Sequence, residues 1–339
     1  MEQLTYTGAD ALEWQEVPEP RLHSDAAALV RPRAVATCDL DALIIAGSSP
    51  FAPPFALGHE CVAEVLDVGD GVRSLEPGQL VSVPFQISCG ACDACRAGRT
   101  SNCGEVAFMS TYGFGPAVEQ WGGFLSDVVC VPHAEHMLVP VPAGIDPAAV
   151  ASASDNLGDA WRAVGPALAE RPGAPVLVVG GAGPGSIGLY AVALAVALGA
   201  ESVTYVDADA RRRETAERLG AQTLDEIPKR LGQFPVTVDA GGDPRGLELA
   251  LRCTAPDGLC TSVAIYFGAQ PTMPLLAMYT KGITFKTGRS NARPAIPHVL
   301  ELTASGALHP ELVTTNTVAW SDAADALVER DWTKLVIER

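Results

Sequence analysis

Apolar and polar residues alternate in short steps along the first part of the chain. Up to about residue 150, runs rich in β-branched and other apolar residues are separated by Gly, Pro and Asp, which favour turns. The clearest runs are residues 28–36, 61–69, 79–85 and 124–132. This pattern predicts a domain built mostly from short β-strands.

The pattern changes near residue 150. From Val176 to about Phe267, apolar runs of strand length alternate with segments of helical periodicity. The predicted strands are 176–179, 202–208, 235–241 and 259–268, the predicted helices between them are 186–200, 211–221 and 245–255, and a helix at 296–308 and a strand at 334–339 follow. Such alternation predicts parallel βαβ units in a doubly wound α/β sheet.

Residues 176–200 are apolar almost throughout, a feature that is also typical of a membrane span. The first part of this segment, VLVVGGAGPGSIG, carries several glycines and a proline, which a helix surrounded by lipid tolerates poorly. A buried strand, a glycine turn and a buried helix explain the segment better. We therefore expect it to belong to the parallel sheet and not to a membrane.

Length and charge narrow the classes of partner. The 339 residues suggest about two domains. Forty acidic residues against 23 basic ones give a net charge of -17, and so acidic a chain repels the phosphates of nucleic acid. The first residues, MEQLTYTGAD, lack the basic and apolar parts of a secretory signal. We expect a cytoplasmic protein with neither nucleic acid nor a membrane as its partner.

Four of the nine cysteines form a cluster with the spacing C-x2-C-x2-C-x7-C. They are Cys89, Cys92, Cys95 and Cys103. Four thiolates on one short loop can surround Zn²⁺ as a tetrahedron and leave no open position, so we expect a structural zinc site. An iron–sulfur cluster and four unligated thiols are the alternatives.

A glycine-rich turn follows the predicted strand 176–179. Gly183, Gly185 and Gly188 form G-x-G-x-x-G, and Asp207 ends the next predicted strand 19 residues later. Backbone amides at the start of the helix would receive a pyrophosphate, and the carboxylate would accept from ribose hydroxyls and repel a 2′-phosphate. This predicts a site for NAD(H), and the alternative is a turn that serves packing alone. The residues expected around the phosphates are Gly181, Gly183, Gly185, Ser186, Ile187 and Gly188.

Three dispersed residues complete the candidates for chemistry. They are Cys38, His59 and Asp155, and each alone has a structural explanation, as a small buried residue, a satisfied histidine or a helix N-cap. Their spacing does not unite them.

Together, these motifs resemble those of the zinc-dependent medium-chain dehydrogenases/reductases, the alcohol dehydrogenase-like group, over essentially the whole chain. The resemblance rests on Cys38, Gly58-His59-Glu60 and Asp155 in that order, and on the four-cysteine loop and the glycine turn. It implies that Cys38, His59 and Asp155 hold a catalytic zinc with one position left for the substrate oxygen. Two zinc ions per chain and NAD(H) are then the expected cofactors.

The resemblance implies roles for further residues. Asp41 would orient the ligating imidazole through its other nitrogen, and Glu60 would lie close behind the metal. Arg212 would lie beside the adenosine. The residues expected to line an apolar substrate pocket are Leu40, Phe85 and Trp161, although an aromatic residue such as Trp161 is more often plain core.

The resemblance also implies an architecture. Residues 1–153 and 291–339 would form a mostly-β, GroES-like catalytic domain with a structural zinc lobe at 86–104, and residues 154–290 a Rossmann-type coenzyme domain. The substrate, a small molecule, would bind between the domains, at the C-terminal edge of the parallel sheet. A homodimer or homotetramer is expected.

Three positions depart from the family pattern. Leu40 stands where Ser or Thr usually passes on the alcohol proton, the glycine turn is about three residues longer than usual, and Asp159 replaces a common Thr. The leading hypothesis is a zinc-dependent oxidoreductase that moves a hydride between NAD(H) and an alcohol or carbonyl compound. The alternatives are an NAD(P)H-dependent reductase of an iminium or conjugated C=C acceptor, and a non-catalytic protein that binds zinc and nucleotide.

Overall fold

The structure is a computed structural model, and it describes residues 1–114, 121–228, 231–268 and 270–339. The chain divides into two compact units, which are described separately below. Unit 1 comprises Met1–Gly158, Asn291–Ser305 and Thr314–Arg339, and unit 2 comprises Asp159–Ser290 and Gly306–Val313.

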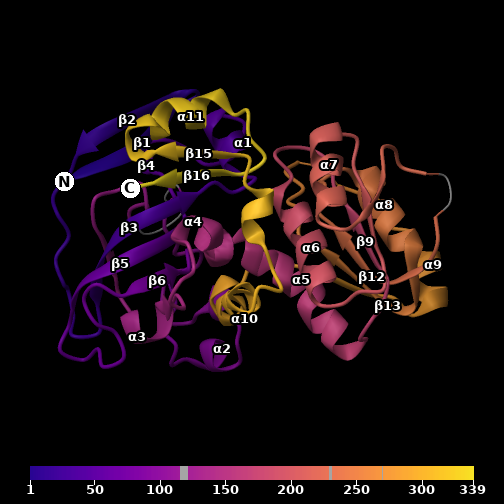
Figure 1. Ribbon diagram of the computed structural model, residues 1–339, viewed down its shortest axis with the longest axis horizontal. Helices are drawn as coiled ribbons and strands as arrows, with labels where there is room; N and C mark the ends of the chain where they lie inside the picture. The colour runs from indigo at the N-terminus through magenta and orange to yellow at the C-terminus, as the bar shows by residue number, and fades with distance from the viewer. Residues whose placement is uncertain (115–120, 229–230, 269) are drawn as a thin grey trace. The chain divides into compact units, whose positions relative to one another are not determined.

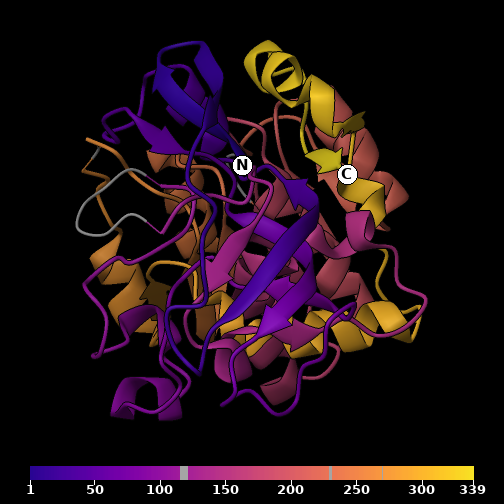
Figure 2. The same cartoon turned by 90° about the vertical axis from the view of Figure 1, so that its left-hand side faces the viewer.

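Unit 1 is built mainly from two sheets whose strands are antiparallel, apart from the parallel pair β15 and β16 (Figures 1 and 2). The smaller sheet has the order β2-β1-β4, and the larger runs β15-β16-β3-β5-β6-β8, with β7 also paired to β3. The strands are β1 (Glu2–Gly8), β2 (Ala11–Glu16), β3 (Ala28–Ala36), β4 (Phe55–Ala56), β5 (Glu60–Val68), β6 (Leu80–Val83), β7 (Val129–Val131), β8 (Val139–Pro140), β15 (Asn316–Ala319) and β16 (Leu335–Glu338). The longest of the accompanying helices is α10 (Ala292–Ala304). The others are short: α1 (Asp41–Ile45), α2 (Asp93–Arg96), α3 (Ala134–Met137), α4 (Pro147–Val150) and α11 (Ala323–Glu329).

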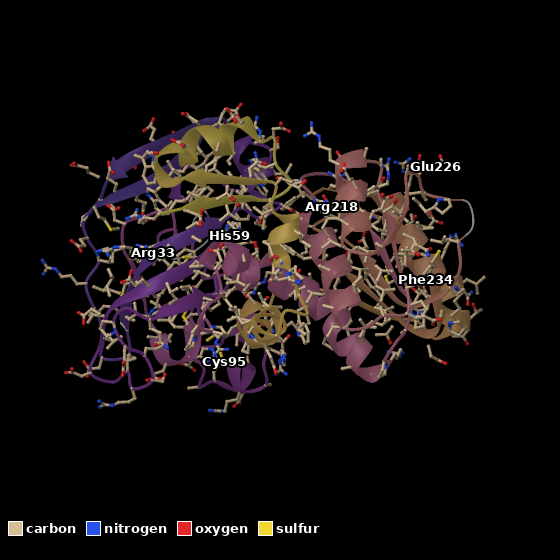
Figure 3. All side chains as sticks on the ribbon, viewed as in Figure 1. Arg33, His59, Cys95, Arg218, Glu226 and Phe234 are labelled. Atoms are coloured by element: carbon tan, nitrogen blue, oxygen red, sulfur yellow. The ribbon has the colours of Figure 1, made fainter. Side chains whose placement is uncertain are left out.

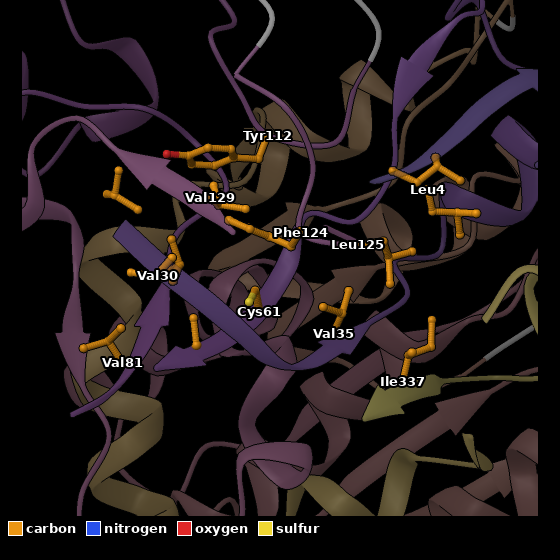
Figure 4. Close-up of a cluster of buried hydrophobic side chains, with 14 of the residues drawn as sticks. Leu4, Val30, Val35, Cys61, Val81, Tyr112, Phe124, Leu125, Val129 and Ile337 are labelled. Atoms are coloured by element: carbon orange, nitrogen blue, oxygen red, sulfur yellow. The ribbon is translucent and has the colours of Figure 1, made fainter. Parts of the chain in front are cut away.

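The core of unit 1 forms between the strands of the larger sheet and the segments that cross it. Inward-facing residues of β3, β5, β6 and β16 pack together with Phe124, as Figure 4 shows. β3 alternates buried and partly buried positions over most of its length, as expected for a strand with one face on the core. This packing fixes the carboxyl end of β3 beside the start of β5, where Ala36 pairs with Glu60.

Unit 2 is a six-stranded parallel sheet with the order β11-β10-β9-β12-β13-β14. Its strands are β9 (Val176–Val179), β10 (Val203–Val206), β11 (Gln222–Leu224), β12 (Phe234–Asp239), β13 (Thr254–Ser262) and β14 (Thr284–Thr287). The helices α6 (Ser186–Ala197), α7 (Ala210–Arg218), α8 (Pro244–Cys253) and α9 (Leu275–Lys281) connect them. The order reverses between β9 and β12, so right-handed crossovers place α6 and α8 on opposite faces of the sheet (Figure 1). The predicted doubly wound sheet is confirmed.

Two predicted strands differ from the structure. The run 124–132 is a strand only at Val129–Val131, because Phe124 and Leu125 instead donate their N–H groups to Gly58 and Leu57. The run 259–268 begins earlier and ends at Ser262, since the neighbouring strand β12 ends at Asp239. Within the described residues, no helix combines the length and apolarity needed to cross a bilayer.

Candidate functional site

Three side chains from three separate segments of unit 1 meet at one point. Their ligand atoms, the Sγ of Cys38, a ring nitrogen of His59 and a carboxylate oxygen of Asp155, all lie within 4.8 Å of one another. All three residues are buried, and His59 has no exposed surface. We call these residues the open group, since they leave one position of a tetrahedron unfilled.

The sheet of unit 1 explains how the open group assembles. Cys38 follows β3 by two residues, and His59 directly precedes β5, which pairs with β3. Gly58 has φ +91°, and a side chain there would lie 2.7 Å from the backbone nitrogen of Leu125, so only glycine fits. The turn into β5 therefore depends on this glycine.

Asp155 is tied to β5 by the residues on either side of it. The Ser154 hydroxyl oxygen accepts from the N–H of Cys61 at 2.7 Å, and the Asn156 N–H donates to Glu60 at 3.0 Å. Asp155 itself ends a short 3₁₀ turn, and its carboxylate faces Nε2 of His59 at 3.5 Å. Two backbone anchors thus hold the third side chain of the open group in place.

The ring of His59 points each nitrogen at a carboxylate. Nε2 faces Asp155, and Nδ1 lies 3.6 Å from Asp41, whose other oxygen accepts from the Cys38 N–H at 2.7 Å. Among the described residues, neither ring nitrogen has a hydrogen-bond partner, although the ring is fully buried. Two unsatisfied nitrogens are costly in a protein interior unless a ligand takes one of them.

Electrostatics also favour a cation in the open group. Burial raises the pKa of the Cys38 thiol well above its usual range, and the charge of Asp155 raises it further. A thiolate and a carboxylate in so small a buried space are stable only with a compensating positive charge. The donor set of one sulfur, one nitrogen and one oxygen is one that Zn²⁺ takes, so the residues present fit zinc.

Behind the open group lies a buried ion pair that the sequence did not indicate. Lys334 and Glu60 both have fully buried side chains, and their Nζ and Oε2 atoms are 2.6 Å apart. Lys334 also donates to the carbonyl of Thr37. Burial raises the pKa of the Glu60 carboxyl, while the Lys334 ammonium opposes that rise. Glu60 is therefore engaged by Lys334 and Asn156 and lies outside the open group.

The four cysteines of the second group meet on one loop of unit 1. Their sulfurs lie within 4.8 Å of one another, with Cys89 and Cys95 at 4.0 Å and Cys92 and Cys103 at 3.9 Å. A regular tetrahedron with Zn–S bonds of about 2.3 Å has S–S edges of about 3.8 Å. We call these residues the closed group. His59 and Cys95, one from each group, are labelled in Figure 3 at separate places in unit 1.

Backbone N–H groups point at the sulfurs of the closed group. Gly104 and Cys95 donate to Cys92 and hold the pKa of its thiol down to about 6. The loop is tied to the start of α10 through Asn291, which accepts from Thr100 and Ser101. Such contacts are typical of a loop that holds a metal as thiolates.

The turn after β9 and the end of β10 form the predicted coenzyme region of unit 2. Gly183 and Gly185 have positive φ angles, and Ser186, Ile187 and Gly188 form the buried start of α6. A side chain at Gly181 would lie 2.8 Å from Gly241 after β12, so the two turns meet where the strand order reverses. This is the position at which doubly wound sheets bind nucleotides.

Two family models match the chain. The alcohol dehydrogenase GroES-like domain matches residues 24–143, and the zinc-binding dehydrogenase model matches residues 186–305. L-galactonate-5-dehydrogenase of Escherichia coli is 32% identical over 335 residues, which are 94% of this chain and 92% of that protein. The chain belongs to the zinc-dependent medium-chain dehydrogenases/reductases.

Other relatives agree with this family. A probable zinc-binding alcohol dehydrogenase of Mycobacterium tuberculosis is 28% identical over 336 residues, covering 96% of this chain and 84% of that protein. The solved alcohol dehydrogenase of Thermus sp. ATN1 superposes with a TM-score of 0.90 at 29% identity, over 100% of this chain and 99% of that one. Like these medium-chain dehydrogenases, the chain is an oxidoreductase, as predicted.

Aromatic rings surround the open group of this dehydrogenase. Phe85, predicted from the sequence, has its ring centroid 5.7 Å from that of His59. Phe114 is closer, at 4.3 Å, and Phe51 lies 5.5 Å from Phe114. Phe114 was missed, because nothing in its local sequence marks it as a neighbour of His59.

The two remaining pocket candidates belong to different units. Leu40 is partly buried beside Cys38, and its N–H points at the Cys38 sulfur at 3.4 Å. Trp161 lies on α5 (Asn156–Glu170), in the part that belongs to unit 2, where its ring covers Gly165 of the same helix. Asp159, on the same helix, pairs with Arg162 at 2.5 Å.

Proposed function

We propose that the chain interconverts an alcohol and its carbonyl compound, with NAD(H) as the preferred coenzyme and with zinc held by Cys38, His59 and Asp155. The observation that carries the proposal is the convergence of these three buried side chains within 4.8 Å. Both ring nitrogens of His59 lack a hydrogen-bond partner among the described residues, which supports a metal ligand at this place. One of the two relatives reported above is named a probable zinc-binding alcohol dehydrogenase and the other an L-galactonate-5-dehydrogenase, which supports dehydrogenation as the reaction class.

When bound, zinc supplies Lewis-acid polarisation of the substrate oxygen, and the nicotinamide ring supplies or takes the hydride. The residues of the chain prepare the site for this chemistry. Cys38 and Asp155 bring two negative charges, which would balance a divalent ion. Asp41 lies 3.6 Å from Nδ1 of His59, where it would accept from that nitrogen and orient the ring once Nε2 binds the metal.

The surroundings of the open group favour an apolar substrate. Phe85 and Phe114 contact His59 through their rings, and Leu40 adds an aliphatic side chain beside Cys38. Such a wall excludes water from the reacting atoms and gives no hydrogen bond to a polyol. We therefore favour a secondary or primary alcohol with an alkyl or aryl substituent.

Asp207 supports NAD(H) as the preferred coenzyme. It directly follows β10 and has a fully buried side chain, next to the turn that is expected to receive the pyrophosphate. A carboxylate at this position accepts from ribose hydroxyls and disfavours a 2′-phosphate.

A turnover screen on protein of known zinc content tests the proposal. Two zinc ions per chain, and oxidation of apolar alcohols with NAD⁺ or reduction of the matching ketones with NADH, are the expected results. Reduction of an iminium or a conjugated alkene, without activity on carbonyl compounds, would favour the reductase alternative. Two zinc ions and tight NADH binding without turnover of any of these compounds would favour a non-catalytic role.

An assembly of two or four copies forms part of the proposal. Among the described residues no strand pairs with the outer edge of β14, and α9 beside it buries none of its residues. Leu275, Leu276 and Tyr279 on α9 are 66%, 77% and 85% exposed. Large apolar side chains next to an open strand edge favour pairing with a second copy. Light scattering on the protein and on Leu276→Glu tests this, and a monomeric unaltered protein would contradict it.

A further inference from the structure

The carboxylate of Asp207 has no acceptor site left over in this structure. Its Oδ1 accepts from the N–H of Asp209 and from Nη2 of Arg212, both at 2.8 Å. Its Oδ2 accepts from the Tyr205 hydroxyl at 2.5 Å and from Nε of Arg212 at 2.8 Å. A carboxylate offers about four lone pairs, so these four donors fill it.

The same guanidinium reaches across to the glycine turn. Nη2 of Arg212 donates to the carbonyl of Gly181 at 2.6 Å, and Nη1 donates to that of Gly183 at 2.8 Å. Gly185, at φ +78°, leaves room for the arginine, since a side chain there would lie 2.7 Å from its Cδ. Arg212 therefore bridges the two places that a dinucleotide is expected to occupy, the phosphate turn and the ribose carboxylate.

This arrangement has opposite consequences for the two coenzymes. NADH can bond its ribose hydroxyls to Asp207 only where Arg212 gives up part of a bidentate ion pair, which makes binding weaker. A 2′-phosphate faces a carboxylate whose charge is already paired, and it meets a guanidinium that suits phosphate geometry. The repulsion that a lone carboxylate would exert on NADPH is thereby reduced.

We propose that Arg212 is a specificity-determining residue that lowers the preference of this site for NADH over NADPH by covering the carboxylate of Asp207. The inference rests on the proposed coenzyme site. It adds that the selectivity belongs to the Asp207–Arg212 pair and not to the aspartate alone.

The substitution Arg212→Met tests the inference, because it keeps an unbranched side chain over Gly185 and removes the guanidinium. The dissociation constants of NADH and NADPH are measured by nicotinamide fluorescence on zinc-loaded protein, without substrate. We expect the ratio of the NADPH constant to the NADH constant to rise by roughly 10-fold or more, as the loss of one charge-assisted contact implies.

Arg213→Met is the matched control. Arg213 carries the same charge one residue further on, but it donates to the backbone carbonyls of Asp207 and Ala208 and not to the carboxylate. The ratio should stay unchanged in this variant. An equal rise in Arg213→Met would assign the effect to net charge and overturn the inference.

Arg212→Lys covers the case in which the methionine variant does not fold. A lysine keeps the charge but reaches one carboxylate oxygen at a time, so we expect a smaller rise in the ratio. An unchanged or lower ratio in both Arg212 variants would overturn the inference. Failure of the unaltered protein to bind either coenzyme would instead overturn the coenzyme site itself.

Discussion

The closed and open groups of unit 1 are built in opposite ways. The closed group takes its four sulfurs from one loop of 15 residues, and backbone N–H groups of the same loop point at them. The open group takes its side chains from three distant segments, which the pairing of β3 with β5 and the anchors beside Asp155 bring together. A local group can form wherever its loop turns correctly, whereas the dispersed one depends on the whole sheet.

The two groups also differ in what surrounds them. Cys89, Cys92 and Cys103 are partly exposed, and backbone donors lower the pKa of the Cys92 thiol, whereas burial raises the pKa of the Cys95 and Cys103 thiols. Cys38 is buried, with a raised thiol pKa, beneath aromatic rings and next to an open position. Four ligands without a vacancy suit stability, and three ligands in an apolar enclosure suit a reaction. Variants in each group should therefore separate folding from turnover.

The largest expected effect is the loss of activity in His59→Ala. This variant removes one of three ligands while it leaves the closed group intact. Because metal catalysis contributes several kcal/mol, a loss of about 4 kcal/mol would lower kcat/KM on the order of 10³-fold. Atomic absorption should find one zinc per chain instead of two. His309→Ala, at an exposed histidine that pairs with Glu311, is the control. A His59→Ala variant that retains both zinc ions would show that the open group is not the second metal site.

Next in size is the effect of Lys334→Met on stability. The substitution leaves the Glu60 carboxylate buried without its cation. Breaking a fully buried ion pair in this way costs about 3–5 kcal/mol of unfolding free energy. Urea unfolding measures this loss.

The double variant Lys334→Met/Glu60→Gln supplies the control, because it removes both charges. It should recover a large part of the lost stability, since the remaining amide needs no counter-charge. A single variant within about 1 kcal/mol of the unaltered protein would contradict the view that this pair holds the scaffold of the open group.

The difference between the groups also explains what could be predicted from the sequence. The closed group and the glycine turn are local patterns, so the spacing of Cys89 to Cys103 and of Gly183 to Gly188 predicts them directly. The doubly wound sheet follows from the alternation of apolar periods, and it is confirmed. The prediction of the open group rested only on the resemblance to a family, because the spacing of its three residues does not relate them.

What could not be predicted depends on contacts between distant segments. Lys334 is the first residue of a short, largely apolar run near the end of the chain, and the sequence alone suggests a lysine exposed to solvent. Its burial follows from the pairing of β16 with β3, which no local pattern encodes. Phe114 was missed for the same reason, since its contact with His59 joins segments that the sequence does not relate. The donors that fill Asp207 lie within five residues of it, and they were missed because spacing alone does not show which way these side chains point.

A smaller effect is expected for Cys92→Ser in the closed group. Metal binding at a structural site contributes to folding free energy, and a loss of about 3 kcal/mol would lower Tm by roughly 6–12 °C. Turnover per folded molecule at 25 °C should stay within about twofold of the unaltered protein, because the open group is untouched. Cys130→Ser, outside both groups, is the matched control. A Cys92→Ser variant with normal Tm and lost turnover would reverse the roles assigned to the two groups.

The smallest effect concerns Leu40, which makes the open group differ from its usual form. Oxidation of an alcohol releases the hydroxyl proton, and an aliphatic side chain can neither accept nor donate it. In Leu40→Ser a hydroxyl stands beside Cys38, while the backbone N–H that points at the Cys38 sulfur is kept. Turnover of an alcohol should rise roughly 10-fold and at most about 10²-fold, the low end for acid–base assistance.

Leu40→Ala is the matched control, because it opens the same space without a hydroxyl. If alcohol loses its proton directly to solvent in the unaltered protein, its rate should climb steeply with pH, and the serine variant should flatten that dependence while the alanine variant does not. A serine variant that gains carbonyl reduction but loses activity on the native substrate would favour an acceptor that needs no proton at oxygen. Serine and alanine variants with equal rates and pH profiles would show that Leu40 is only a wall of the pocket and that the proton leaves by another route.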